Sequence, residues 1–218
     1  TEQFIEVLPP GMPLFVSDVD GTLTERRADD HSIVCDEEAE YPAIWRSMLG
    51  DVPQPLVHAG AAPVFRSLAN AGYRPFYLTA RPEPLINRTR AFLKERNRHD
   101  GRGDLPQGII HTTLGLTGAL NGSAESFKKA EIARLVAKGF KVELAFGNRP
   151  TDRAAYEQHD VAFQFYFDNR ATALRVCTTV ESAPALPFPF SSMKPGDYRI
   201  SSYERLKVAA AGVSPVCR

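Results

Sequence analysis

The stretch FVSDVDGTLTE, residues 15–25, decides the fold of this chain and raises the question of its function. It continues a short apolar run and then places Asp18 and Asp20 one residue apart, followed by a glycine and two threonines. Two carboxylates this close repel each other unless a cation lies between them. The stretch therefore predicts a buried strand that ends either in a polar turn or in a site that holds a metal ion and acts on a substrate.

The overall composition is ordinary for a globular protein. The chain has 218 residues, of which 43% are hydrophobic and 24% charged, and this length allows a substantial buried core. Lys and Arg together number 26, as do Asp and Glu, so net charge gives no reason to expect a nucleic-acid partner. No apolar run approaches the roughly 20 residues that a transmembrane helix needs.

Short apolar runs alternate with amphipathic stretches along most of the chain. The runs predicted as strands are residues 14–17, 75–79, 108–112, 142–146 and 162–167. Helical spacing of apolar residues predicts helices over residues 62–71, 84–96 and 126–137, and a short capped helix that begins at Thr151. This order predicts a single α/β domain, a three-layer sandwich whose mainly parallel sheet is covered on both faces.

Polar residues follow several of the predicted strands. Asp18 follows the first strand, Thr79 ends the second and Asn148 follows the fourth. Ligands of open α/β sheets bind beyond the carboxyl ends of the strands, at the point where the strand order reverses. We therefore expect these side chains to share one site.

The first of these segments has the chemistry of phosphoryl transfer. The carboxylate of Asp18 can attack phosphorus and form an aspartyl-phosphate, which divides hydrolysis into two easier steps. Asp20 points to the same side of an extended chain, where it can protonate the leaving oxygen and then activate water. Gly21 permits a sharp turn of the backbone, and Thr22 places a hydroxyl within reach of the phosphoryl pocket.

Later segments complete the predicted set of catalytic groups. Thr79 can hydrogen-bond a phosphate oxygen, and Lys128 supplies a positive charge to the oxygens of the transition state. The stretch GNRPTD, residues 147–152, adds Asn148 and Asp152 near a metal ion. Phosphoryl transfer depends mainly on positioning and charge neutralisation, so these groups together are sufficient for it.

Mg²⁺ is the metal that this set predicts, because it prefers one or two carboxylates together with substrate oxygens and water. The predicted metal ligands are Asp18, Asp20, Asn148 and Asp152. The predicted substrate-binding residues are Gly21, Arg81 and Arg149, although a salt-bridging role for the two arginines is equally open.

The ordered motifs resemble those of the haloacid-dehalogenase-like (HAD) phosphatases, and more closely the lipin-type phosphatidate phosphatases. The segments that carry the resemblance are DVDGT, AGYRPFYLTAR, TRAFL, LPQGII, ESFKKAEI and FGNRPTDRAAY. They also resemble the related C-terminal domain of the membrane-associated phosphatidylinositol-transfer proteins. The resemblance covers residues 12–170, which predicts a HAD-like core there and a C-terminal extension over residues 171–218.

The resemblance implies roles for individual residues. Asp18 would be the nucleophile, Asp20 the acid/base and Lys128 the lysine that holds the phosphate. Mg²⁺ would lie between Asp18, the backbone carbonyl of Asp20 and the loop that carries Asn148 and Asp152. Many members of the wider superfamily have Asp at the position of Asn148, so this site would carry one negative charge less.

The segments between the motifs bear on the substrate. Insertions at residues 25–58, with six acidic residues between Asp29 and Glu40, and at about 97–124 show no core of their own, so no large cap domain is predicted. A weakly covered site suits a large or membrane-bound phosphate ester, and residues 81–102 contain seven Lys or Arg against three Asp or Glu. This basic segment could meet anionic head groups, although a solvated helix face explains it equally well.

The sequence therefore predicts a Mg²⁺-dependent phosphatase, with phosphatidate as the preferred substrate on the strength of the resemblance. The alternatives are a module that binds phosphatidate without cleaving it, which the intact DVDGT opposes, and a phosphatase for a soluble or nucleic-acid phosphate. We expect a chain that is soluble or peripheral to a membrane, with the cytoplasm favoured and a secreted or periplasmic location left open. Cys35, Cys177 and Cys217 form no CxxC pair, and one disulfide or three free thiols both fit.

Overall fold

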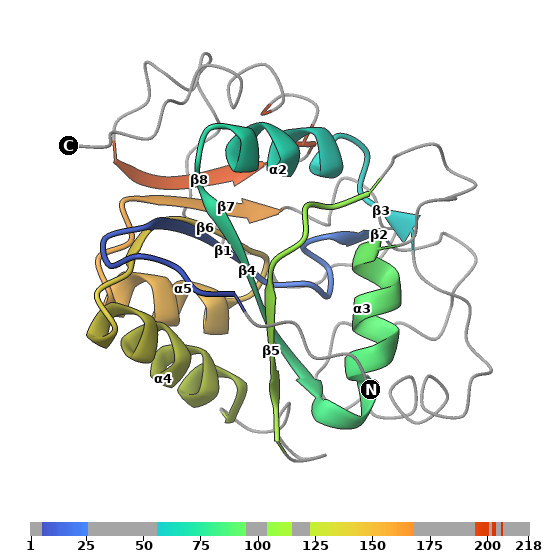
Figure 1. Cartoon of the computed structure of the whole chain (residues 1–218). Coiled ribbons are helices and arrows are strands. Elements are labelled where there is room, and N and C mark those ends of the chain that lie inside the picture. Colours follow the sequence, from blue (N-terminus) through green and yellow to red (C-terminus); the bar gives the residue numbers. More distant parts are fainter. Residues whose placement is uncertain are drawn as a thin grey trace.

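The computed structural model shows a parallel β-sheet between two layers of helices (Figure 1). It describes residues 6–25, 56–94, 104–114, 123–167, 195–200, 202, 203 and 206. Within these ranges six strands pair in parallel, in the order β5-β4-β1-β6-β7-β8. Their bounds are β1 Pro13–Ser17, β4 Arg74–Pro82, β5 Ile109–Thr113, β6 Lys141–Gly147, β7 Phe163–Phe167 and β8 Gly196–Ile200.

The helices connect these strands. They are α2 Ala61–Asn70, the 3₁₀ helix η2 Glu83–Leu85, α3 Ile86–Lys94, α4 Ser123–Ala137 and α5 Pro150–Gln158. Two short strands, β2 Thr24–Glu25 and β3 Leu56–Val57, form a separate antiparallel pair. Strand β2 comes soon after β1 in the chain, and β3 comes just before α2. In Figure 1, α4 and α5 lie on one side of the sheet and α2 on the other.

Side chains of the central strand alternate between two hydrophobic cores. Phe15 packs with Phe65 of α2, with 4.9 Å between the ring centroids. Its neighbours Leu14 and Val16 face the opposite core, which includes Ile132 of α4. Strand β1 pairs with β4 on one edge and with β6 on the other, so it lies inside the sheet and brings Asp18 to the middle of the carboxyl edge.

The structure confirms the predicted α/β class, the parallel sheet and its two helical layers. Each predicted strand and helix is present among the described residues, with ends that differ by up to a few residues. The main difference is β4, which continues past Thr79 to Pro82. Its pairing with β5 shifts between Leu78 and Pro82: Leu78 pairs with His111 and Pro82 with Thr113, so β4 has two more residues than β5 in this stretch.

The segment after residue 184 also differs from the prediction, which made it irregular until residue 203. Strand β8 pairs in parallel with β7 and buries Tyr198 and Ile200. Beyond this strand, Tyr203 and Leu206 are completely buried in the core that contains Phe15. Only two apolar side chains of this short polar strand face the core, which is too few for a recognisable pattern.

Several predicted features fall outside the described residues. They include nearly all of the acidic connection, much of the second insertion and the three cysteines. Within the described part of the chain, no helix has the length and apolar character needed to cross a membrane.

Candidate active site

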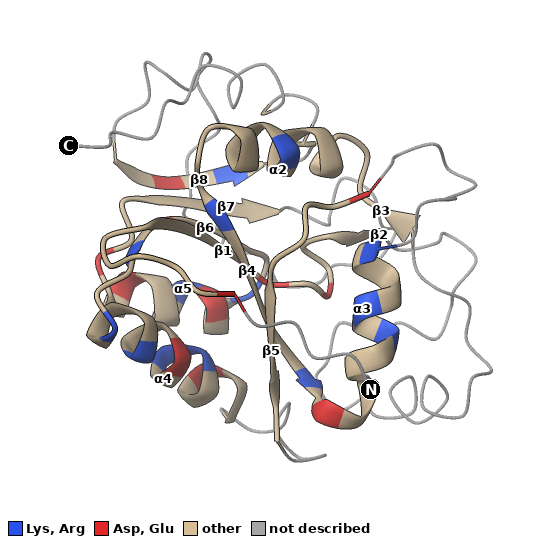
Figure 2. Cartoon of the chain, in the orientation of Figure 1, with Lys and Arg blue, Asp and Glu red and all other residues tan. Residues whose placement is uncertain are grey.

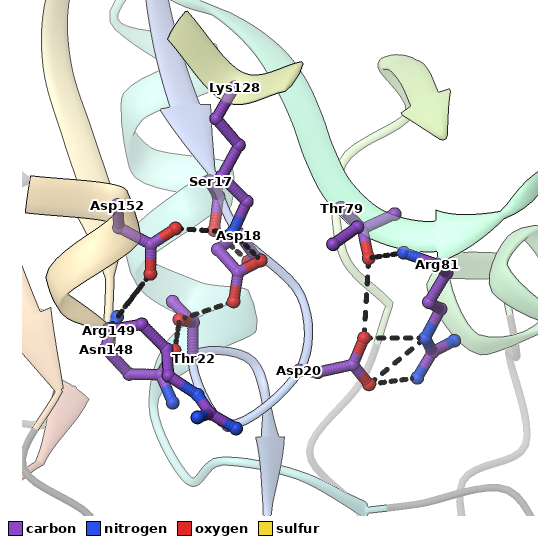
Figure 3. A network of polar contacts seen from close by, with 12 residues as sticks. Ser17, Asp18, Asp20, Thr22, Thr79, Arg81, Lys128, Asn148, Arg149 and Asp152 are labelled. Atoms are coloured by element: carbon purple, nitrogen blue, oxygen red, sulfur yellow. Dashed lines mark hydrogen bonds and ion pairs between the residues drawn. The ribbon is translucent and has the colours of Figure 1, made fainter. Parts of the chain in front are cut away.

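The predicted site residues gather at the carboxyl edge of the sheet, around the end of β1 (Figure 3). Asp18 directly follows β1, Thr79 lies on β4 and Asn148 directly follows β6, and these two strands flank β1. Lys128 reaches the same place from α4. The sheet therefore joins segments that are far apart in the sequence.

A buried lysine joins two buried carboxylates at the centre of the site. Lys128 Nζ lies 2.8 Å from Oδ1 of Asp18 and 2.5 Å from Oδ1 of Asp152. The side chains of Lys128, Asp18 and Asp152 are only 4%, 6% and 0% exposed. One positive and two negative charges thus lie almost out of contact with water.

The pKa values of this cluster follow from its burial and its charges. Burial raises the pKa of Asp18 to about 7; Lys128 opposes this rise, and the charges of Asp152 and Asp20 add to it. Burial alone would lower the pKa of Lys128, but the charges of Asp152 and Asp18 outweigh it, so its pKa lies above the usual range. Lys128 is therefore a permanent cation beside Asp18.

Asp152 holds the loop after β6 in place. Its Oδ2 accepts hydrogen bonds from the backbone N–H groups of Asn148 and Arg149, each at 3.0 Å. This is the typical arrangement for a carboxylate in the first turn of a helix, here α5. The absence of a side chain at Gly147 is needed, because a Cβ there would lie 2.6 Å from Cβ of Asp152.

The hydroxyl of Thr22 links the first motif to the last. Its Oγ1 lies 3.1 Å from Oδ2 of Asp18 and 3.1 Å from Oδ1 of Asn148. The backbone carbonyl of Thr22 in turn accepts a hydrogen bond of 2.9 Å from the phenol of Tyr203. A residue far towards the C-terminus thus holds Thr22, which in turn contacts Asp18.

The turn after β1 has the conformation that the sequence predicts. Gly21 has a φ of 75°, in the left-handed region that favours glycine. Its N–H donates to Oγ1 of Thr24 at 2.8 Å, which closes the turn. This turn carries the chain away from the sheet between Asp18 and Thr22.

Asp20 points to a different partner from Asp18, although the sequence predicts that both face the same side. The chain is extended only to Ser17, and a turn includes Asp20, so the two-residue alternation of a strand no longer applies. Figure 3 shows its carboxylate directed towards Thr79 and Arg81. Oδ1 lies 2.6 Å from Nη2 of Arg81, and Oδ2 lies 2.8 Å from Nε.

The arginine governs the ionisation of Asp20. Partial loss of contact with water would by itself raise the pKa of Asp20, but the charge and hydrogen bonds of Arg81 outweigh this effect, so the pKa of Asp20 lies below the usual range. The hydroxyl of Thr79 contributes a hydrogen bond of 3.3 Å to Oδ2. Asp20 is therefore an ionised carboxylate in this arrangement.

The donor set fits a hard divalent cation such as Mg²⁺. Asp18 and Asn148 present oxygen atoms on either side of the Thr22 hydroxyl, and oxygen is the ligand that Mg²⁺ prefers. The cluster of Asp18, Asp152 and Lys128 carries one net negative charge when fully ionised, which a cation would offset. Asp152, the other predicted carboxylate ligand of this loop, holds Lys128 with one oxygen and the loop backbone with the other.

No group of three His, Cys, Asp or Glu side chains in the described ranges converges in a way that could hold a metal ion. The fit to Mg²⁺ therefore depends on oxygen ligands of other kinds. These are the amide oxygen of Asn148, which lies near Asp18, and the backbone carbonyl of Asp20, which the family resemblance implies as a ligand. Arg149, predicted to bind substrate, contributes its backbone N–H to the loop, and Figure 3 shows its side chain extending below Asn148.

Sequence reasoning missed the residues that support the site. Thr24 shapes the turn, Tyr203 holds Thr22, and Thr89 accepts a hydrogen bond of 3.2 Å from Nη1 of Arg81. The Thr22–Leu23–Thr24 spacing is the one local signal, since a hydroxyl three residues after Gly21 can cap its turn. Nothing near Tyr203 in the sequence points to a residue 181 positions away.

Comparison with known proteins shows what this chain is similar to. Residues 7–181 match the model of the family described as LNS2 (Lipin/Ned1/Smp2). The chain is 26% identical over 161 residues to Phosphatidic acid phosphohydrolase 1 of Saccharomyces cerevisiae, covering 74% of this chain and 16% of the yeast protein. It is also 26% identical over 156 residues to Nuclear elongation and deformation protein 1 of Schizosaccharomyces pombe, covering 66% and 21%.

The chain thus spans about a fifth or less of the length of these relatives. Among solved structures, it is similar to a HAD-like protein of Mesorhizobium loti, with a TM-score of 0.51 and 15% identity, over 96% of this chain and 90% of that one. This likeness confirms the HAD-like fold. Because the family match covers well over half of its residues, the chain belongs to the LNS2 (Lipin/Ned1/Smp2) family.

Proposed function

We propose that this protein is a Mg²⁺-dependent phosphatase that acts through an aspartyl-phosphate, with phosphatidate as its substrate and diacylglycerol and phosphate as products. The observation that carries the proposal is the placement of Asp18. Its carboxylate is buried at the end of the central strand, beside the ammonium of Lys128 and the hydroxyl of Thr22. A buried carboxylate without an opposite charge would be protonated, and Lys128 supplies that charge.

In the first step of the proposed reaction, a carboxylate oxygen of Asp18 attacks the phosphorus of the ester. The bond between phosphorus and the leaving oxygen breaks, and Asp20 in its protonated form gives its proton to that oxygen. Lys128 and the hydroxyls of Thr22 and Thr79 stabilise the charge of the transferring group. Diacylglycerol then leaves.

In the second step, Asp20 accepts a proton from water as the water attacks phosphorus. The bond between phosphorus and Asp18 breaks, which releases phosphate, restores the carboxylate of Asp18 and leaves Asp20 protonated for the next cycle. Mg²⁺, held by Asp18, Asn148 and the carbonyl of Asp20, would neutralise the negative charge that the phosphate brings to this site.

Two observations support a lipid substrate. The Saccharomyces cerevisiae relative is named for the hydrolysis of phosphatidic acid. The described part of the basic segment, residues 81–94, contains four Lys or Arg and one acidic residue. Figure 2 shows basic residues along α3, next to the strand that carries Arg81, whereas α4 carries both signs of charge. A basic helix beside the site suits the anionic surface on which such a lipid lies.

A substrate panel tests the proposal. Phosphatidate in mixed micelles, a soluble aryl phosphate and a nucleic acid with a terminal phosphate would each be assayed for phosphate release with Mg²⁺ and with EDTA. We expect release from phosphatidate that depends on Mg²⁺ and disappears in Asp18→Asn. Asp197→Asn is the control, because Asp197 of β8 pairs with Arg153 of α5, outside the predicted site.

The other outcomes separate the alternatives. Binding of phosphatidate vesicles without phosphate release from any substrate would identify a binding module. Release from a soluble or nucleic-acid phosphate but not from phosphatidate would overturn the lipid substrate and keep the mechanism. Full activity of Asp18→Asn on any ester would overturn the mechanism itself.

A further inference from the structure

In the ion pair between Asp20 and Arg81, the arginine side chain is held by its neighbours, whereas the aspartate side chain is partly exposed to solvent. The Arg81 side chain is 12% exposed and that of Asp20 is 40% exposed. The two carboxylate oxygens accept three hydrogen bonds from Nε and Nη2 of the guanidinium, at 2.6–3.1 Å. Such bidentate pairs are among the stronger polar contacts in proteins.

Two contacts besides Asp20 hold the guanidinium in place. Its Nη1 donates to Oγ1 of Thr89, which itself donates to the carbonyl of Leu85 at 3.1 Å. Its Cζ lies 5.9 Å from the centre of the Phe92 ring. Both contacting residues lie on α3, so the Arg81 side chain has contacts that do not depend on Asp20.

The backbone of β4 aims Arg81 and Thr79 at the same place. Their segment lies in the irregular stretch where β4 gains two residues relative to β5. The hydroxyl of Thr113 lies 3.2 Å from the carbonyl of Ala80 and 3.4 Å from that of Arg81, which ties this stretch to β5. Bulges of this kind redirect side chains next to active sites.

Asp20 cannot perform its proposed role while it is bound in this way. A general acid needs a proton on one oxygen, and each oxygen here faces a guanidinium N–H instead. If Asp20 leaves, however, the mostly buried guanidinium of Arg81 loses a bidentate anionic partner, which is unfavourable unless another anion takes its place. The substrate of the proposed reaction brings such an anion.

We propose that Arg81 binds the phosphate group of the substrate, and that the phosphate displaces Asp20 from the guanidinium. In the free protein Asp20 occupies this position. On binding, phosphate oxygens take the same N–H groups, and the released Asp20 carboxylate takes up a proton from solvent and faces the leaving oxygen. Binding of the substrate phosphate therefore itself releases Asp20, the proposed acid/base, from Arg81. This inference rests on the proposed function, because it assigns Arg81 to the same phosphate site.

The surroundings of Arg81 favour such an exchange. Thr79 lies on the same strand two residues before Arg81 and hydrogen-bonds Asp20, so its hydroxyl becomes available to the phosphate when Asp20 leaves. Arg88 adjoins Thr89, the residue of α3 that contacts Arg81, and adds a second positive charge there. Burial and then the charge of Arg81 lower the pKa of Arg88. A phosphate dianion offers these cations more negative charge than the single carboxylate does.

Phosphate binding to four proteins tests the exchange. Orthophosphate would be titrated calorimetrically, with Mg²⁺ present, into the wild type, Asp20→Asn, Arg81→Gln and the double variant. We expect Asp20→Asn to bind phosphate about tenfold more tightly, because it competes less for Arg81, and Arg81→Gln to bind it about tenfold more weakly. In the double variant, the gain from Asp20→Asn should be absent.

The double variant distinguishes displacement from simple repulsion. If Asp20→Asn tightens phosphate binding equally in the wild-type and the Arg81→Gln backgrounds, then Asp20 acts only through its negative charge and the exchange is wrong. Unchanged phosphate affinity in Arg81→Gln would also overturn it. Arg81→Lys keeps the charge but loses the bidentate geometry, and we expect its affinity to lie between those of the wild type and Arg81→Gln.

Arg74→Gln is the matched control, because Arg74 begins the same strand and pairs with Glu6 at 3.2 Å. We expect its phosphate affinity and its turnover to equal those of the wild type. The inference and the proposed function can fail separately. If turnover is unaffected in Arg81→Gln, only the inference about Arg81 is wrong. If phosphate displaces Asp20 as expected but no ester is hydrolysed, only the proposed phosphatase function is wrong.

Discussion

The ammonium of Lys128 lies 2.8 Å from the carboxylate of Asp18, although the two residues are 110 positions apart in the sequence. The same ammonium contacts Asp152, so one buried cation serves two buried anions. The pair is strong only because both partners are present, since the removal of one would leave a charge without compensation. Fold stability and proposed activity therefore depend on the same side chain.

We expect Lys128→Met to lower the free energy of unfolding by about 3–5 kcal/mol and to abolish turnover, because Asp18 and Asp152 would face each other without a cation. Lys129→Met is the matched control: Lys129 is the next residue of α4, and its side chain is 30% exposed and pairs with Glu125. It should change stability by less than about 1 kcal/mol. Urea unfolding of the two variants measures the difference, and equal values would contradict a structural role for the buried cluster.

Mg²⁺ should stabilise the wild-type protein and not Asp18→Asn. At about 100 times its dissociation constant, a bound ion raises the free energy of unfolding by about 2.7 kcal/mol. Asp18→Asn removes both a predicted ligand and the net negative charge of the cluster. Thermal unfolding with Mg²⁺ and with EDTA measures this effect, and an equal response of the two proteins would place the ion elsewhere.

Gly147→Ala should disturb the site by steric contact. Its added Cβ would lie 2.6 Å from Cβ and 2.8 Å from Oδ2 of Asp152, and this rigid neighbour holds Lys128. We expect a loss of about 1–3 kcal/mol of stability together with reduced turnover, measured by urea unfolding and by phosphate release.

The control for this change is Gly11→Ala. Gly11 has a φ of 79°, but a Cβ there meets nothing within 4 Å. Its backbone strain should lower stability by about 1–2 kcal/mol without an effect on the kinetic constants. If both variants retain full activity, the contact between Gly147 and Asp152 has no part in the site.

Tyr203→Phe should affect both stability and turnover. It leaves the buried carbonyl of Thr22 without the phenol at 2.9 Å, which costs about 1–3 kcal/mol. Because Thr22 contacts Asp18 and Asn148, we expect kcat to fall as well.

The control for this change is Tyr73→Phe. It loses a comparable hydrogen bond of 2.8 Å to Glu143, near the amino ends of β4 and β6, and it should lower stability alone. A fall in kcat in both variants would show that lost stability, and not the position of Thr22, is responsible.

Much of the fold could be predicted because it rests on local patterns. Val64, Phe65 and Leu68 lie at helical spacing, and α2 buries all three against the sheet. Alternating strands and helices leave few topologies for a parallel sheet, so the polar residues at the strand ends could be expected at one edge. Strand β8 escaped prediction because β7 decides its position, and its own five residues contain only two buried apolar side chains.

The sequence by itself determined the identity of the chemical groups, and with them the reaction class that they favour. The types and order of Asp18, Asp20, Lys128 and Asn148 follow from the chain alone, as does the turn at Gly21. Only the tertiary structure decided which groups face each other: Lys128 lies between Asp18 and Asp152, and Asp20 turns to Arg81. The reason is physical, because hydrogen bonds and ion pairs act over about 3 Å, and only packing brings residues about 60 or 110 positions apart to that distance.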